Sequence, residues 1–179
     1  MTLKLKKRIM SMIHSQLEII EQAKGFLSSL SDTQYTHIVK PHFGSSAGAH
    51  MRHIIDHYLA LMHREGNSVN YNIRHRFSDV ENSTAEAIKQ LDSIIDWLNN
   101  LDESTLNMPV EVISEISVSE QRDFAGHSTF GRELVFVSSH AVHHFFTLKL
   151  IAKMQNIDID SGFGLAPATA SYQRSQIAS

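Results

Sequence analysis

The sequence predicts an all-α fold, a four-helix bundle, and three observations support that prediction. Four segments repeat apolar residues at helical spacing, each is long enough for several turns, and each is bounded by polar or glycine-containing stretches. Apolar residues make up 42% of the 179 residues and charged residues 20%, which is typical of a globular chain. We expect one bundle domain over 1–160 and a C-terminal tail over 161–179 that packs partly on it.

The first predicted helix covers residues 2–30 and the second covers 46–65. In the first, apolar residues recur at steps of three and four up to Leu30. The second can be capped by Ser45 or Ser46 and ends at Gly66, where a polar loop over 66–82 begins.

The third predicted helix covers 84–100 and the fourth covers 129–155. The third begins with a capping-box sequence from Ser83 to Glu86. The fourth carries a regular apolar stripe: Leu134, Val137, Ala141, His144, Leu148 and Ile151. Between them, apolar and polar residues alternate, so we expect any strand or hairpin to be short and confined to about 108–120.

Composition excludes several classes of function. The chain has no Cys, which rules out disulfides, a cysteine nucleophile and thiolate metal sites. The net charge of −3 is spread along the chain and predicts no nucleic-acid partner. Apolar runs fall far short of the ~20 residues of a membrane span, and the N-terminus does not resemble a signal peptide. We therefore expect a cytoplasmic protein with no membrane association.

The first helix also predicts self-association. Its apolar residues occupy nearly adjacent positions, so its stripe is wider than one partner helix needs; the residues concerned are Met12, Ile13, Ile19 and Ile20. Two-fold symmetric pairing is the commonest way to cover such a face. We expect a homodimer.

Histidine is unusually abundant, with 12 His against 16 Lys and Arg combined. Six of these histidines form two clusters inside predicted helices: His50, His53 and His57 in the second, and His140, His143 and His144 in the fourth. Residues four apart on a helix lie one above the other. His140 and His144 therefore share the core-facing stripe, whereas His143 lies at or beyond its edge.

The pair His140 and His144 predicts a metal site shared with the second helix. A buried imidazole without partners costs on the order of 1–3 kcal/mol, and a metal ion satisfies one nitrogen of each ring. On the second helix His50 and His57 lie nearer the centre of the apolar face than His53, but angles alone do not choose between His53 and His57. Imidazoles suit Zn, Ni, Fe or Co better than Mg or Ca.

Four segments, taken in order, resemble the DinB-like (DinB/YfiT) family of metalloenzymes, especially an uncharacterised bacterial branch. They read SSAGAHMRHIIDHY, NYNIRHRF, GRELVFVSSHAVHHFFTLKLI and FGLAPAT, and they extend from about Ser45 to Thr169. The resemblance implies a four-helix bundle that holds a metal ion by one histidine of the second helix and an HxxxH pair of the last.

Carried over to this sequence, the resemblance implies that His140 and His144 are the pair and that His53 is the third ligand. The choice of His53 rests on its distance from the small-residue cap at Ser46. Other residues become pocket or supporting residues around the metal: His57, His50, His143 and Glu133. Asp56 could, like Glu133, orient a ligand imidazole through its far nitrogen.

The resemblance implies a divalent-metal-dependent enzyme. Characterised relatives include thiol-dependent transferases and isomerases that use bacillithiol, mycothiol or glutathione, so a low-molecular-weight thiol is a candidate cosubstrate. The alternatives are a metal-dependent hydrolase and a non-catalytic metal-binding or stress-response module. Asn72 and Phe145 depart from the residues often found in relatives, so we do not expect the small-molecule substrate to be inherited unchanged.

The polar loop carries candidate substrate-binding residues, namely Tyr71, Arg74 and Arg76. Guanidinium groups match carboxylates and phosphates, so these side chains could hold an anionic substrate over the metal. The alternative is that they only tie the loop to the bundle.

Overall fold

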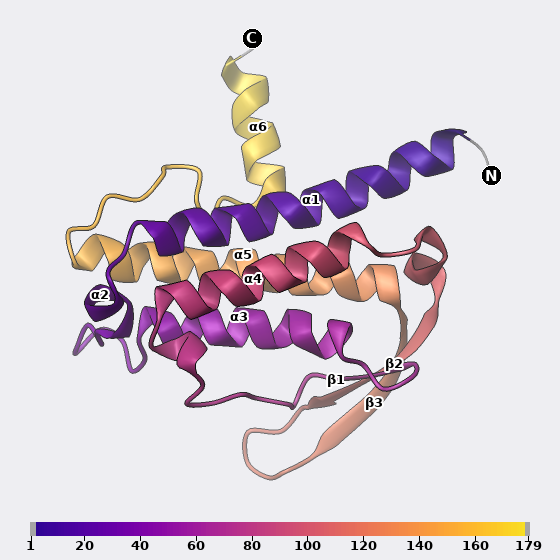
Figure 1. Ribbon diagram of the computed structural model, residues 1–179, viewed down its shortest axis with the longest axis horizontal. Helices are drawn as coiled ribbons and strands as arrows, with labels where there is room; N and C mark the ends of the chain where they lie inside the picture. Colours follow the sequence, from indigo (N-terminus) through magenta and orange to yellow (C-terminus); the bar gives the residue numbers. More distant parts are fainter. Residues whose placement is uncertain (1–2, 178–179) are drawn as a thin grey trace.

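Four long helices lie side by side in the computed structural model, which describes residues 3–177 (Figure 1). They are α1 (Leu3–Ser28), α3 (Ala47–Met62), α4 (Thr84–Asn99) and α5 (Phe130–Met154). α3 packs against α4 and α5, and α1 packs against the same two helices. The ends of the predicted ranges at residues 1, 2, 178 and 179 lie outside the described residues.

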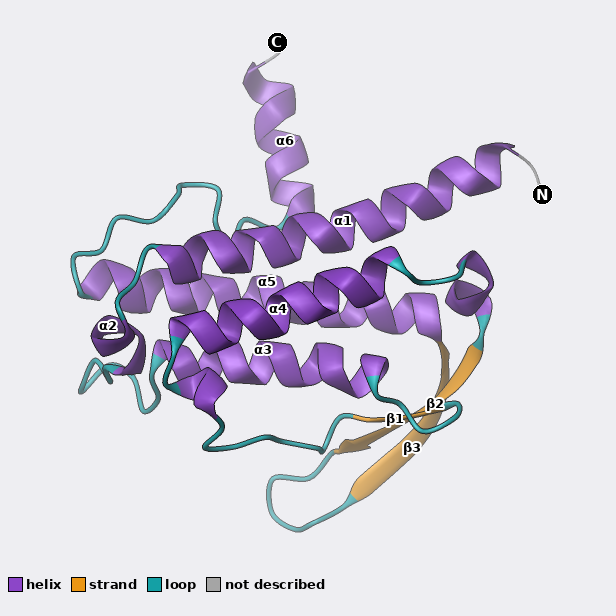
Figure 2. Ribbon diagram, in the orientation of Figure 1, coloured by secondary structure: helices purple, strands orange, loops and turns teal. Residues whose placement is uncertain are grey.

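Shorter elements connect and extend these helices. They are α2 (Asp32–Thr36), α6 (Pro167–Ile177), the 3-10 helices η1 (Asp79–Glu81) and η2 (Glu103–Asn107), and the strands β1 (Ser68–Asn70), β2 (Pro109–Glu115) and β3 (Asp123–Thr129). β2 pairs with β3 in antiparallel register and with β1 in parallel register, in the order β1-β2-β3. The sheet lies at one end of the helices (Figure 2).

The prediction of an all-α four-helix bundle is therefore wrong as a fold class. The described chain adds a mixed three-stranded sheet to the helices, and its strands are not confined to 108–120. β1 is only three residues long and pairs in parallel with a strand about 40 residues away, so it leaves no local pattern. β3 is largely exposed, so its residues lack the alternation that marks a half-buried strand.

Two of the long helices, α3 and α4, nevertheless begin where the cap residues predict. The side-chain oxygen of Ser46 accepts a hydrogen bond from the amide of Ala49, and Ser83 caps α4 in the same way. α2 is an element that the sequence reading missed. It begins with a full capping box between Ser31 and Gln34.

The core lies between α1, α3, α4 and α5. In α5 the predicted stripe is buried except at one position: Leu134, Val137, Ala141, Leu148 and Ile151 are at most 1% exposed. His144 is only partly buried, and its neighbour Phe145 occupies the core instead. The helix thus places His140 and His144 at the edge of the core, where they face α3.

α5 is long and apolar enough to cross a membrane by length and composition alone, and it is the one such helix among the described residues. Core helices of soluble proteins pass the same test. Here the helix packs against α1 and α3.

The segment after α5 packs on the bundle through Phe163. Its ring is stacked between those of Phe26 and Phe145, with centroids 4.9 and 4.7 Å away. α6 then projects away from the body, and none of its described residues is buried (Figure 1).

Candidate metal centre

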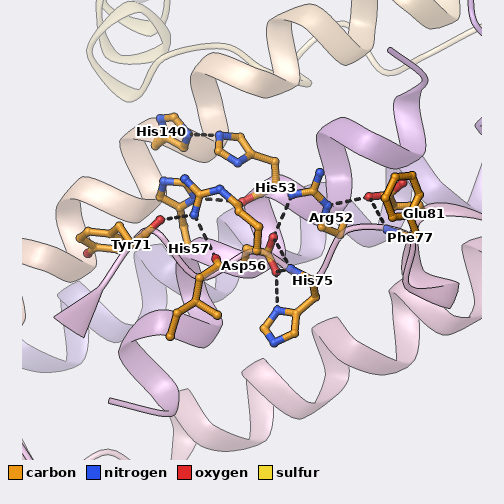
Figure 3. A network of polar contacts seen from close by, with 11 residues as sticks. Arg52, His53, Asp56, His57, Tyr71, His75, Phe77, Glu81 and His140 are labelled. Atoms are coloured by element: carbon orange, nitrogen blue, oxygen red, sulfur yellow. Dashed lines mark hydrogen bonds and ion pairs between the residues drawn. The ribbon is translucent and has the colours of Figure 1, made fainter. Parts of the chain in front are cut away.

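Three histidines from two helices converge at the α3–α5 interface. One ligand nitrogen from each of His53, His57 and His140 lies within 4.8 Å of the other two. His53 and His57 are four residues apart on α3, and α5 brings His140 from the opposite side (Figure 3). Three imidazole nitrogens gathered in this way could hold a first-row divalent ion.

The spacing of two of these rings suits a shared metal ion. Nε2 of His53 and Nε2 of His140 lie 3.1 Å apart. Two nitrogens bound at ~2.0–2.1 Å in tetrahedral geometry would be about 3.3 Å apart. Without a metal, one ring donates its proton to the other, so an ion would take the place of that proton.

His57 presents a defined nitrogen to the cluster. Its Nδ1 lies 2.9 Å from the backbone oxygen of His53, an acceptor only, so Nδ1 carries the proton and donates it. Nε2 of the neutral ring then keeps its lone pair. The ring is 5% exposed and stacks on Tyr71, with centroids 5.3 Å apart, so it has little freedom to turn.

His144 borders the cluster. Its ring centroid lies 4.8 Å from that of His53 and 4.6 Å from that of His140, but its Nδ1 is 3.1 Å from Nδ1 of His50. The other nitrogen of His50 contacts the hydroxyl of Ser45 at 3.0 Å. The structure thus brings His57 into the group of three, and a ligand role for His144 stays a prediction.

Burial keeps the cluster histidines neutral. It lowers the pKa of His53 to about 2, with further lowering by the neighbouring His57, His144, Arg74 and His140. Burial is also the main cause that lowers the pKa values of His57, His140 and His144 to about 4. Unprotonated rings are the form that binds metals, so the site needs no deprotonation of imidazolium at neutral pH.

Aromatic side chains and one carboxylate surround the cluster. The ring of Phe136 stacks on that of His140 with centroids 5.9 Å apart. The Tyr71 hydroxyl donates to Oε2 of buried Glu133 at 2.9 Å, and Ser128 donates to Oε1 at 2.6 Å. Burial and the nearby Glu133 carboxylate raise the pKa of Tyr71. Glu133 thus acts on the cluster through Tyr71, by holding the ring that covers His57.

A network of ion pairs and hydrogen bonds around the buried Asp56 attaches the 71–82 loop to α3. The Asp56 side chain is 1% exposed and accepts from Arg52 at 2.9 Å and from Nδ1 of His75 at 2.7 Å, as Figure 3 shows. Arg52 also donates to Glu81 at 2.8 Å, and Glu81 accepts from the Phe77 amide. Asp56 therefore anchors the loop, and its hydrogen bonds go to Arg52 and His75 rather than to a cluster imidazole.

This network was missed at the sequence level. The one local indication of it is that Arg52 and Asp56 are four residues apart on a helix, the spacing at which opposite charges can pair. Nothing local indicates that His75, 19 residues further on, returns to Asp56.

The structure separates the remaining candidates. Arg74 is partly buried beside the cluster, whereas Arg76 and His143 are exposed. The Arg74 side chain donates to the backbone oxygens of Tyr71 and Ile73.

Comparisons with known proteins give one curated relative. FK506-binding protein 5 of Rhizopus delemar is 31% identical over 108 residues, which cover 60% of this chain and 28% of that protein. The chain thus spans little more than a quarter of that relative's length. No protein-family model matches the chain. This relative and the mixed sheet contradict the description of the chain as a DinB four-helix bundle. The resemblance to the DinB-like family itself stays a prediction.

Proposed function

We propose that the protein is a metal-dependent enzyme whose divalent transition-metal ion is held by His53, His57 and His140. The observation that carries the proposal is the convergence of their ligand nitrogens within 4.8 Å. Zn, Ni, Fe and Co all accept such an imidazole set.

The residues present fit such an ion in three respects. The donors are neutral because burial lowers their pKa values. The backbone contact of His57 leaves Nε2 free to bind. The stacking of Tyr71 on His57 and of Phe136 on His140 holds two of the rings in place, as the surroundings of a metal site must.

Three protein ligands leave coordination positions for an exogenous molecule. A bound divalent ion would lower the pKa of a water or a thiol placed there and so supply a nucleophile at neutral pH. The chain's own part is to fix the ring orientations and, through Tyr71 and Phe136, to limit the water around the cluster. The reaction class is therefore nucleophilic attack of a thiol or of water on a small-molecule electrophile, in which the new S–C or O–C bond replaces the bond to a leaving group and the nucleophile's proton is released.

Metal analysis tests the ligand set. Protein purified without a nickel resin should contain close to one equivalent of a first-row transition metal, or take up one equivalent of Zn²⁺ or Co²⁺. His57→Ala should lose the metal, as should His53→Ala and His140→Ala. The exposed His143→Ala is the matched control on α5 and should keep it.

Two outcomes would contradict this assignment. If His144→Ala loses the metal while His57→Ala keeps it, the ligand set is His53, His140 and His144. If the wild-type protein binds no transition metal, the proposal fails. For the reaction, an electrophile panel with and without a thiol, compared with an ester panel, separates S-transfer from hydrolysis. A loaded protein inactive in both panels would favour a non-catalytic metal-binding module.

A further inference from the structure

We propose that Arg74 forms an anion-binding subsite beside the metal centre and that this subsite receives the carboxylate of a small-molecule substrate. The inference rests on the proposed function, because it assigns the substrate class of the same site.

Backbone contacts hold the Arg74 guanidinium in place. Its Nη1 donates to the carbonyl oxygens of Tyr71 and Ile73, the latter at 3.1 Å. The Tyr71 ring in turn stacks on His57. The guanidinium is thus tied to the residue that covers one of the metal ligands, and its remaining donors, Nε and Nη2, are left for another partner.

Arg74 lacks the acidic partner that a partly buried guanidinium usually has. Among the side chains that the structure describes, those of residues 12–102 and 104–177, no carboxylate lies within ion-pair distance of it. The buried Asp56 is paired with Arg52 and His75, and Glu81 is paired with Arg52. Burial and the neighbouring Arg52 and Arg76 charges lower the pKa of Arg74, and Asp56 opposes them.

The charge of Arg74 also acts on the metal site. It is among the causes that lower the pKa values of His53, His57 and His140, so the guanidinium lies close enough to influence all three ligands. A bound divalent ion would add further positive charge to this region. An anion placed between the ion and Arg74 would be attracted by both.

The donor geometry favours a carboxylate. Nε and Nη2 form one edge of the guanidinium fork, and the two oxygens of a carboxylate can accept from both donors at once. One unpaired guanidinium balances a single negative charge. We therefore infer a monoanionic group on the substrate, with the reacting atom toward the metal.

Spectral titration of cobalt-loaded protein tests the subsite without an activity assay. Propionate should bind, as seen by a change in the cobalt d–d spectrum or by calorimetry. Its neutral isostere propionamide should bind at least tenfold more weakly. Arg74→Gln should bind cobalt like the wild type but weaken propionate binding by about tenfold or more. Arg76→Gln, an exposed arginine of the same loop, is the matched control and should change it by less than about twofold.

The outcomes separate the two proposals. If the wild-type protein does not bind cobalt, the proposed function is overturned and this inference with it. Normal cobalt binding with equal propionate affinity in Arg74→Gln and Arg76→Gln would overturn the subsite alone. Tighter binding of inorganic phosphate than of propionate would overturn the carboxylate class. If Arg74→Gln does not fold, Arg74→Lys keeps the charge but removes the fork, and it should also weaken propionate binding.

Discussion

The protonation of His57 in the candidate metal centre is set by the helix that carries it. Because Nδ1 donates to the backbone oxygen of His53, one turn earlier, Nε2 is the only nitrogen that can bind a metal. His144 also has its Nδ1 engaged, with Nδ1 of His50, but the group of ligand nitrogens that lie within 4.8 Å of one another includes His57 and not His144. The choice between these two residues therefore depends on ring orientation rather than on which residues share a helix face.

The tautomer of His57 is directly measurable. In metal-free protein at pH 7, ¹⁵N-detected NMR should show His57 protonated at Nδ1, because that nitrogen donates to a carbonyl. Addition of Zn²⁺ should shift the Nε2 resonance and leave the Nδ1 proton in place. A ring protonated at Nε2 in the free protein would contradict the assignment.

The histidine cluster should make the metal-free protein sensitive to acid. The pKa values of His53, His57 and His140 are lowered to about 2, 4 and 4, against 6.5 for the unperturbed group. The unfolded chain therefore binds more protons than the folded chain below pH 6.5, and the free energy of unfolding should fall as pH drops from 6.5 toward 4. Urea titrations across this range measure the fall.

A cluster variant provides the comparison for this pH dependence. His53→Asn removes the ring with the lowest pKa, so its free energy of unfolding should vary less between pH 6.5 and 4 than that of the wild type. An unchanged slope would contradict a role for the cluster in acid sensitivity.

The 71–82 loop is held on α3 by a few polar contacts, and Asp56 is central among them. Asp56→Asn should lower the free energy of unfolding by roughly 2–4 kcal/mol, because Arg52 and His75 lose a buried anionic partner. Asp92→Asn breaks an exposed pair with Lys24 and should cost at most about 1 kcal/mol. Chemical denaturation measures the free energy of unfolding of both variants. Equal effects would show that the contacts of Asp56 with Arg52 and His75 do not stabilise the fold.

Two helical glycines give opposite predictions for the same substitution. A Cβ on Gly48 in α3 would lie 1.9 Å from the backbone oxygen of Glu81, so Gly48→Ala must push the loop away and should destabilise the protein by roughly 1–3 kcal/mol. A Cβ on Gly25 in α1 meets nothing within 4 Å, so Gly25→Ala should stabilise it by about 0.5–1 kcal/mol. Thermal unfolding of both variants checks the sign, and a stabilised Gly48→Ala would contradict the close packing of loop and helix.

For the molecule as a whole, metal binding should appear as added stability. A ligand that binds only the folded state adds about 2.7 kcal/mol at a free concentration of 100 times Kd. Zn²⁺ should therefore raise the Tm of the wild type and of His143→Ala, and a chelator should reverse the rise. His140→Ala should show no such shift, and a shift equal to that of the wild type would place the stabilising metal elsewhere.

The homodimer and the cytoplasmic location stay predictions. In the structure Ile19 and Ile20 are buried within the protomer, while Met12 and Ile13 are only partly buried. Light scattering at tens of micromolar protein should give the mass of a dimer. A monomeric mass would contradict the prediction and show that the apolar face of α1 needs no second protomer to cover it.

The sequence by itself determined the features that depend on near neighbours. Helical periodicity and cap residues such as Ser46 located the four long helices, because their hydrogen bonds and caps span only a few residues. The i, i+4 spacing likewise identified His140 as facing inward, together with a group of histidines on the facing helix.

Only the tertiary structure decided the features that join distant segments. The pairing of β1 with β2 and the return of His75 to Asp56 bring together residues far apart in the chain, and no local pattern specifies them. The same holds for the ring orientations that turn His144 toward His50 and leave His57 beside His53 and His140. Helix geometry fixes which face a side chain lies on, but the packing of α3 against α5 fixes where its nitrogen points.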